Sequence, residues 1–262
     1  MSLSHRHDMN AANQGISDKE LAGRIDHTLL NPEATGGDIR QLCEQAKTYG
    51  FHGVCVNGRW VSLAADLLAS SNVAVVGVVS LPLGADTTKI KVAQARESIF
   101  AGADEIDMVA DLAAIVEGDA DYLLGQLRAV LKVCRSMTPS VLLKVIIESA
   151  ALSKEQKIFA CQVAQQAGVD FIKTCTGLHP AGGATIEDVI LLKQAAPNCR
   201  IKAAGGIRTA KQAIEMLQAG AERIGTSVGA QIMEELRASN RPDGGNPAMN
   251  PPQERRTSCG AK

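Results

Sequence analysis

The feature that most constrains the fold of this chain is a repeat of short β-branched runs, each followed by a longer amphipathic stretch. Such alternation is typical of βα units, in which helices connect neighbouring parallel strands. We expect eight strands, at residues 24–30, 53–57, 74–81, 105–110, 141–148, 171–176, 200–204 and 223–227. Between them the spacing of apolar residues predicts helices that include residues 37–49, 87–100, 121–136, 154–167, 186–195 and 210–219.

A short motif recurs where a predicted helix meets the next strand. It reads Ala101-Gly102-Ala103-Asp104, Ala167-Gly168-Val169-Asp170 and Ala219-Gly220-Ala221-Glu222. Each glycine stands where the end of a helix needs a left-handed residue, and Ser153 with Gln156 is compatible with a capping box at the start of a helix. Eight units without an interrupting linker favour a closed (β/α)8 barrel, a single α/β domain, over an open sheet.

The two ends of the chain differ in composition from the repeat. Residues 1–17 are mostly polar, and residues 240–262 combine four prolines with Gly, Asn and Arg. We therefore expect a flexible N-terminal segment at 1–17, the barrel at 18–239 and a disordered tail at 240–262.

Composition excludes several classes of partner. The formal net charge of −1 and an aromatic content of 3% argue against a nucleic-acid surface. No apolar run is long enough for a membrane span and no secretory signal is visible, so we expect a cytoplasmic protein. The seven cysteines show neither C-x-x-C pairs nor metal-ligand spacing, so we expect reduced thiols and no metal site.

Two lysines interrupt apolar strands. Lys173 lies in D-F-I-K-T-C-T-G at 170–177, and Lys202 lies on the next strand in R-I-K-A-A-G-G-I. An amine kept neutral by burial or by a neighbouring cation can attack a carbonyl carbon, which indicates Schiff-base chemistry. The alternative for each lysine is that its stem lies on apolar surface while the amine reaches water.

Other charged residues fall toward the same ends of the strands. If the side chains alternate as in a barrel, Asp107 and Lys144 point inward with the two lysines, and Asp107 is the natural counter-ion. The carboxylate and the second amine would then move protons. The alternative is a buried ion-pair network that only supports the barrel.

Glycines after the last strands indicate a second function. Gly205 and Gly206 follow the seventh strand, and Gly225 with Ser227 lies at the end of the eighth. Backbone N–H groups beside a helix start at this place commonly bind phosphate in barrels. Arg208 and Gly177 could complete the rim.

With these residues in place, the chain closely resembles the deoxyribose-phosphate aldolases, a family of class I aldolases, from about residue 25 to residue 228. The motifs that carry the resemblance are I-D-H-T-L-L at 25–30, G-A-D-E-I-D-M-V at 102–109, L-L-K-V-I-I-E at 142–148, D-F-I-K-T-C-T-G at 170–177 and I-K-A-A-G-G-I-R-T at 201–209.

The resemblance implies reversible cleavage of 2-deoxy-D-ribose 5-phosphate to acetaldehyde and D-glyceraldehyde 3-phosphate, without a metal or other cofactor. By motif, Lys173 matches the Schiff-base lysine, Lys202 the lysine that perturbs it, and Asp107 the carboxylate that shuttles protons. The residues that match substrate-binding positions are Asp26, Lys144, Thr176, Gly177, Gly205, Gly206, Arg208, Gly225 and Ser227.

Some positions depart from the family pattern. Cys175 and Val228 stand where relatives have serine, Leu178 stands where some place another lysine, and the tail lacks a terminal tyrosine. Two rival functions stay open: a Schiff-base aldolase for another phosphorylated sugar, and a non-catalytic barrel that binds a sugar phosphate. The expected partners are small phosphorylated sugars and aldehydes, with a homodimer as the expected assembly.

Overall fold

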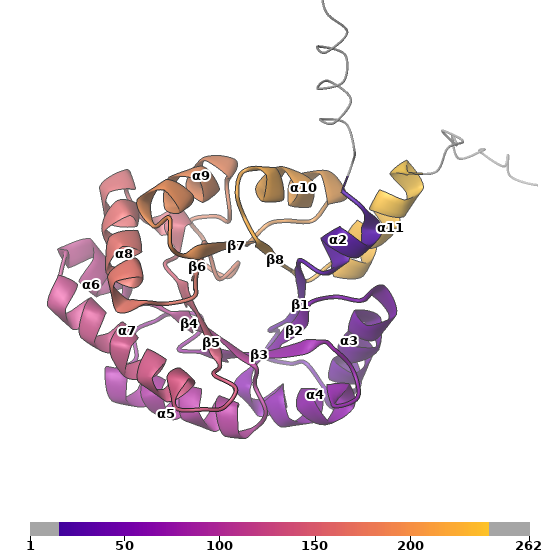
Figure 1. Cartoon of the computed structure of the whole chain (residues 1–262), viewed down its shortest axis with the longest axis horizontal. Helices are drawn as coiled ribbons and strands as arrows, with labels where there is room; N and C mark the ends of the chain where they lie inside the picture. The colour runs from indigo at the N-terminus through magenta and orange to yellow at the C-terminus, as the bar shows by residue number, and fades with distance from the viewer. Residues whose placement is uncertain (1–15, 241–262) are drawn as a thin grey trace, which may run out of the picture.

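The structure is a computed structural model that describes residues 16–240, and it forms a closed barrel of eight parallel strands in chain order (Figure 1). The strands are β1 (Ile25–Leu29), β2 (Gly53–Val56), β3 (Ala74–Val79), β4 (Glu105–Val109), β5 (Leu142–Ile146), β6 (Phe171–Lys173), β7 (Arg200–Ala204) and β8 (Arg223–Thr226). The ring closes where β1 pairs with β8, with Asp26 opposite Gly225. The (β/α)8 barrel predicted from the repeat is confirmed.

Helices surround the ring of strands on the outside (Figure 1). They are α2 (Asp18–Ala22), α3 (Gly36–Tyr49), α4 (Val61–Leu68), α5 (Thr88–Phe100), α6 (Leu112–Glu117), α7 (Ala120–Arg135), α8 (Lys154–Ala167), α9 (Ile186–Ala195), α10 (Ala210–Gln218) and α11 (Gly229–Ser239), with 3₁₀ turns η1 (Gly58–Trp60) and η2 (Ser149–Ala151). The expected flexible segment and disordered tail fall almost wholly on residues 1–15 and 241–262, which lie outside the described residues.

The local signals at helix ends operate as the sequence indicates. Ser153 and Gln156 form a capping box at the start of α8. Gly102, Gly168 and Gly220 all have positive φ, so each ends its helix in a conformation that a Cβ would disfavour. These helix ends determine where β4, β6 and β8 begin.

Strand β6 is shorter than the sequence predicts. It ends at Lys173, because the hydroxyl of Thr174 bonds to β7 where the backbone carbonyl of Thr174 would otherwise do so. This hydroxyl donates to the carbonyl of Ala204 at 2.9 Å and accepts from the N–H of Ala204 at 3.0 Å. Cys175 therefore does not continue the strand alternation from Lys173, and its side chain is fully buried beside Ser149, with an Oγ to Sγ distance of 3.5 Å.

Alternation along the strands divides buried side chains into two layers. On β4, Ile106 and Met108 belong to the main hydrophobic core between strands and helices, whereas Glu105 and Asp107 form ion pairs with side chains of other strands. A small separate apolar cluster consists of Cys55, Val76 and Val78. The rest of the barrel interior is occupied by charge, which is where a functional site is expected.

Among residues 16–240, no helix combines the length and apolar composition needed to cross a bilayer. Six of the seven cysteines lie in this part of the chain, and all six are free and buried.

Candidate active site

One carboxylate, Asp107 on β4, is at the centre of the charged interior. Its Oδ2 lies 2.7 Å from Nζ of Lys173 and 2.8 Å from Nζ of Lys202, and its Oδ1 lies 2.8 Å from Nζ of Lys144. These lysines come from β5, β6 and β7, three consecutive strands whose register brings Lys173 directly opposite Lys202. The three lysines that sequence alternation placed inward therefore all contact Asp107.

A second layer of ion pairs lies behind this one. Lys202 also contacts Asp26 on β1, and Lys144 lies 2.7 Å from Glu105. Arg223 on β8 donates to both carboxylates, at 2.8 Å to Asp26 and 2.9 Å to Glu105. We call these seven residues, Asp26, Glu105, Asp107, Lys144, Lys173, Lys202 and Arg223, the barrel cluster.

Electrostatics in the barrel cluster favour the ionised carboxylates. Burial alone would raise the pKa of Asp107, but Lys144, Lys173 and Lys202 outweigh burial and hold that pKa well below its usual range. For Lys202, burial acts to lower the pKa, and the carboxylates of Asp107 and Asp26 raise it above the usual lysine range. Lys202 is thus held as a cation beside Lys173.

The cluster carries a surplus of positive charge. Its four cations face three carboxylates, which leaves one positive charge in excess. Lys144, Lys202 and Arg223 each contact two carboxylates, whereas Lys173 contacts Asp107 alone. If one cation becomes neutral, the cluster loses its surplus charge, and Lys173 gives up the fewest ion pairs in doing so.

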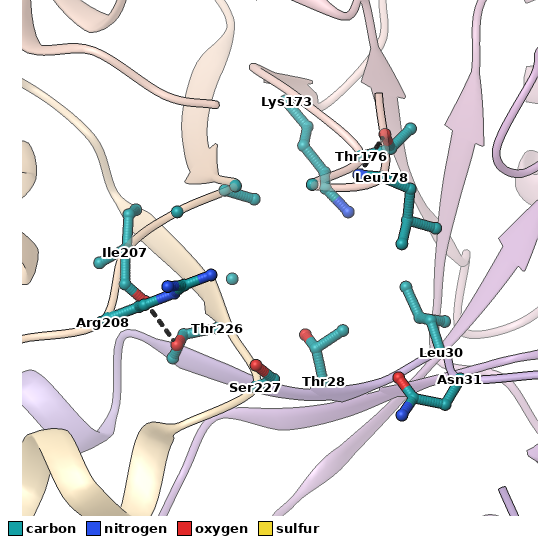
Figure 2. Close-up of a pocket in the computed structure, with 15 residues that line it drawn as sticks. Thr28, Leu30, Asn31, Lys173, Thr176, Leu178, Ile207, Arg208, Thr226 and Ser227 are labelled. Carbon is teal, nitrogen blue, oxygen red and sulfur yellow. Dashed lines mark hydrogen bonds between the residues drawn. The ribbon is translucent and has the colours of Figure 1, made fainter. Parts of the chain in front are cut away.

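A pocket of about 180 Å³ opens above Lys173. Figure 2 shows the amine of Lys173 pointing into it, with Arg208, Thr226 and Ser227 across the space and Leu30 and Leu178 along one side. The full lining is Thr28, Leu30, Asn31, Lys173, Thr176, Gly177, Leu178, Ala204, Gly205, Gly206, Ile207, Arg208, Gly225, Thr226 and Ser227. Within the described residues, Lys173 is the one member of the barrel cluster in this lining.

The side of the pocket opposite Lys173 is suited to an anion. The exposed Arg208 lies there beside Gly206, and the backbone N–H groups of Gly206 and Ser227 make no hydrogen bond to another residue within 16–240. Gly205 has φ +98° and passes so close to Gly183 that a Cβ on Gly183 would lie 2.3 Å from the Gly205 carbonyl oxygen. The loop after β7 can therefore follow this path only because both positions are glycine.

The sequence placed two residues in the pocket that lie elsewhere. Asp26 and Lys144 were expected to bind substrate, but neither lines the pocket, and both side chains are fully buried below it in the barrel cluster. Asp107 and Lys202 are buried there as well. These four side chains lie deeper in the barrel than the pocket, because they pair with one another there. Lys173 lies above them and forms the pocket floor.

Sequence reasoning also missed residues. Glu105 lies two positions before Asp107 and so shares its strand face, a signal that was available in D-E-I-D. Arg223 begins β8, and nothing in its surroundings in the sequence distinguishes it from a surface arginine. Leu30 and Asn31 line the pocket from the loop after β1, where the chain offers no chemical signal.

The departures from the family pattern have defined positions. Cys175 is buried outside the pocket lining, and burial raises the pKa of its thiol, so it is an inert side chain here. Leu178 lines the pocket with 53% of its surface exposed, where a lysine would have added a cation. The N–H of Val228 donates to Thr226 Oγ1 at 3.2 Å and is thus already satisfied.

One group of side chains has the spacing of metal ligands. Asp26, His52 and Glu105 place one donor atom each within 4.8 Å of one another. Both carboxylates already have cationic partners in Arg223, Lys144 and Lys202, and Nε2 of His52 lies 3.0 Å from Glu105. Ion pairing within the chain accounts for this group.

A closed barrel of parallel strands, with reactive side chains gathered below a pocket at the strands' carboxyl ends, defines a (β/α)8-barrel enzyme. Residues 21–235 match the family model described as DeoC/LacD family aldolase. The chain belongs to this aldolase family, and the resemblance drawn from the motifs is confirmed.

Relatives agree with this assignment. A deoxyribose-phosphate aldolase of Thermococcus gammatolerans is 48% identical over 221 residues, which cover 83% of this chain and 97% of the relative. One from Thermoanaerobacter sp. is 46% identical over 216 residues, or 82% and 96% of the two chains. The solved deoxyribose phosphate aldolase of Aeropyrum pernix, described as tetrameric, superposes with a TM-score of 0.80 at 28% identity, covering 91% of this chain and all of that chain.

Proposed function

We propose that this aldolase reversibly cleaves 2-deoxy-D-ribose 5-phosphate to acetaldehyde and D-glyceraldehyde 3-phosphate through an imine on Lys173. The observation that carries the proposal is the position of Lys173: it is the cluster lysine that faces the pocket, and it holds a single carboxylate contact. An amine with these two properties can lose its proton and meet a substrate carbonyl.

The first step frees the nucleophile. Nζ of Lys173 loses its proton to water in the pocket, so the barrel cluster gives up its surplus charge, while Asp107 stays ionised between Lys144 and Lys202. Lys173 then attacks the aldehyde carbon of the open-chain sugar, and the carbinolamine loses water to give a protonated imine. Asp107, 2.7 Å from Nζ of Lys173, relays from water the proton that the departing hydroxyl group requires.

The imine acts as the electron sink for cleavage. The sugar's C3 hydroxyl passes its proton through water to Asp107, the C2–C3 bond breaks, and its electron pair moves toward the iminium nitrogen to form an enamine. D-Glyceraldehyde 3-phosphate leaves at this point. The same proton returns through water to C2 of the enamine, and hydrolysis of the resulting imine releases acetaldehyde and restores Lys173.

Asp107 lies behind Lys173 and does not line the pocket. We therefore assign it the exchange of protons through the nitrogen of Lys173 and through a water molecule at the pocket floor. Lys202 supports this role, because it stays a cation on the Asp107 oxygen that also contacts Nζ of Lys173.

The phosphate end of the substrate fits the side of the pocket that lies opposite Lys173. The guanidinium of Arg208 and the unbonded N–H groups of Gly206 and Ser227 supply charge and donors for a phosphate there. Anchoring the phosphate places the aldehyde at the other end of the pocket, beside Lys173. Thr176, Gly177, Gly205 and Gly225 form the walls between the two ends.

A substrate panel tests the function. Cleavage is measured as release of acetaldehyde from 2-deoxyribose 5-phosphate and 2-deoxyribose, and as release of triose products from fructose phosphates. We expect the highest kcat/KM with 2-deoxyribose 5-phosphate. Preference for a fructose phosphate would favour an aldolase for another sugar, and saturable binding without aldehyde release would favour a non-catalytic sugar-phosphate protein.

Self-association and a cytoplasmic location are further parts of the proposal. Phe100 and Ile90 on α5 are 73% and 47% exposed, and apolar side chains on an outer helix support a homodimer. Sedimentation velocity of the full chain measures the assembly.

The cytoplasmic location is supported by free thiols at all six described cysteines, which suit a reducing compartment.

A further inference from the structure

A buried carboxylate outside the barrel cluster has no part in the mechanism above. Glu148 follows β5, its side chain is fully buried, and among the described residues it forms no ion pair. Its backbone is left-handed, with φ 52° and ψ 57°. Ser80 is the other non-glycine residue with positive φ within 16–240. An uncommon conformation beside an active site is a reason to look for a role.

Within residues 16–240, Thr176 donates three hydrogen bonds to the Glu148 carboxylate. Oε1 and Oε2 each accept the backbone N–H of Thr176 at 3.2 Å, and Oε2 accepts the Thr176 hydroxyl at 2.6 Å. A carboxylate only accepts, so the hydroxyl proton of Thr176 points at Glu148. A lone pair of the same hydroxyl then accepts the N–H of Leu178 at 3.1 Å.

These contacts fix a turn that forms one wall of the pocket. Thr176, Gly177 and Leu178 all line it, and the turn starts three residues after Lys173. Gly177, with φ +79°, packs against the loop after β7, where an added Cβ would lie 3.4 Å from the Cα of Gly205. The turn at 176–178 therefore sets the width of the pocket on the side of the phosphate loops.

We infer that Glu148 is a positioning residue, which holds the turn at 176–178 and so sets the affinity for the phosphorylated end of the substrate. The inference rests on the proposed function, because it assumes that the phosphate lies against the loop after β7. Glu148 does not line the pocket, and it acts through Thr176. The left-handed backbone places its carboxylate beneath the turn.

Glu148→Gln tests this role with little change in shape. Both carboxylate oxygens face the N–H of Thr176, so either orientation of the new amide puts an N–H donor against that N–H. We expect KM for 2-deoxyribose 5-phosphate to rise about tenfold, the loss that corresponds to one hydrogen bond to a charged group. We expect kcat to stay within about threefold, and kcat/KM for unphosphorylated 2-deoxyribose to remain unchanged.

A double-mutant cycle with Thr176→Val checks the route. Because Glu148 and the Thr176 hydroxyl hold the same turn, we expect the two substitutions to be non-additive: KM of the double variant rises by less than the product of the two single effects. Asp188→Asn is the matched control, since Asp188 is also a buried carboxylate but pairs with Lys157, away from the pocket. This control is expected to keep the wild-type KM.

The outcomes separate the two proposals. If wild-type protein does not cleave 2-deoxyribose 5-phosphate, the proposed function fails. If wild-type protein is active, three results would overturn the inference on Glu148. The first is a wild-type KM in Glu148→Gln, and the second is an equal rise in KM for phosphorylated and unphosphorylated 2-deoxyribose. The third is full additivity between Glu148→Gln and Thr176→Val in their effects on KM. Should Glu148→Gln fail to fold, an unchanged KM in Thr176→Val overturns it as well.

Discussion

Replacing Asp107 with asparagine removes the carboxylate that three lysines share. The three contacts of 2.7 to 2.8 Å lie in a site where the Asp107 side chain has no exposed surface. The amide of Asn keeps one acceptor oxygen, and its NH₂ group is a donor that faces an ammonium group. Because one carboxylate is lost, the net charge of the barrel cluster rises from one positive charge to two.

The structure gives the size of both effects. Removing one partner of a buried ion pair costs about 3 to 5 kcal/mol of stability, because a charge is left uncompensated. Loss of a positioned proton-transfer group typically slows turnover by about 10² to 10⁴. We therefore expect Asp107→Asn to remain folded at neutral pH, with a lower free energy of unfolding and with kcat reduced by about 10² to 10⁴.

Two assays separate stability from chemistry. Urea denaturation gives the free energy of unfolding, and acetaldehyde release from 2-deoxyribose 5-phosphate, coupled to oxidation of NADH, gives kcat. Asp188→Asn serves as the control, since its 2.6 Å pair with Lys157 lies outside the barrel cluster. That variant is expected to keep wild-type kcat.

The acid limb of the stability curve provides a further check. The pKa of folded Asp107 lies well below its ordinary value of 3.8, so its stabilising contribution is complete above 3.8 and is lost as the pH falls toward the folded value. The difference in free energy of unfolding between wild type and Asp107→Asn should therefore shrink below about pH 4. A kcat within about tenfold of wild type in a folded Asp107→Asn variant would refute the reasoning.

Three other predictions concern separate parts of the molecule. Burial lowers the pKa of Lys91 to about 8 from 10.5, so the contribution of Lys91 to the free energy of unfolding should rise by about 3 kcal/mol between pH 8 and 10.5. In urea titrations, the difference in free energy of unfolding between wild type and Lys91→Met should change by that amount over this range. Arg208→Ala should raise KM for 2-deoxyribose 5-phosphate about tenfold or more and leave kcat/KM for 2-deoxyribose unchanged; equal loss with both sugars contradicts the phosphate assignment. Gly183→Ala should lower Tm and raise KM, because its Cβ would lie 2.3 Å from the Gly205 oxygen; a wild-type Tm and KM would contradict this.

The sequence predicts the barrel well because its signals are local and repeated. Glycines such as Gly102, Gly168 and Gly220 end helices where the strands then begin, and eight such units leave few architectures. The length of β6 was less predictable. The hydroxyl of Thr174, in place of its carbonyl, accepts the N–H of Ala204 on β7, and a threonine in a β-branched run gives no sign of this.

Within the site, the sequence predicts which residues meet but not how deep they lie. Alternation indicates that Asp107, Lys144, Lys173 and Lys202 share the interior. Whether a side chain reaches the pocket or an ion pair below it depends on the tilt of the strands and on partners such as Arg223, which begins β8 nearly two hundred residues after Asp26. Long-range pairing of this kind has no local pattern.

The account depends most directly on the covalent bond between Lys173 and the substrate carbonyl. Borohydride added in the presence of acetaldehyde reduces an imine to a stable N-ethyl lysine, and peptide mass spectrometry locates it. We expect the adduct on the peptide that carries Lys173, with none on peptides that carry Lys144 or Lys202, whose amines are fully buried in ion pairs. An adduct on another residue, or no adduct in active protein, would contradict the account.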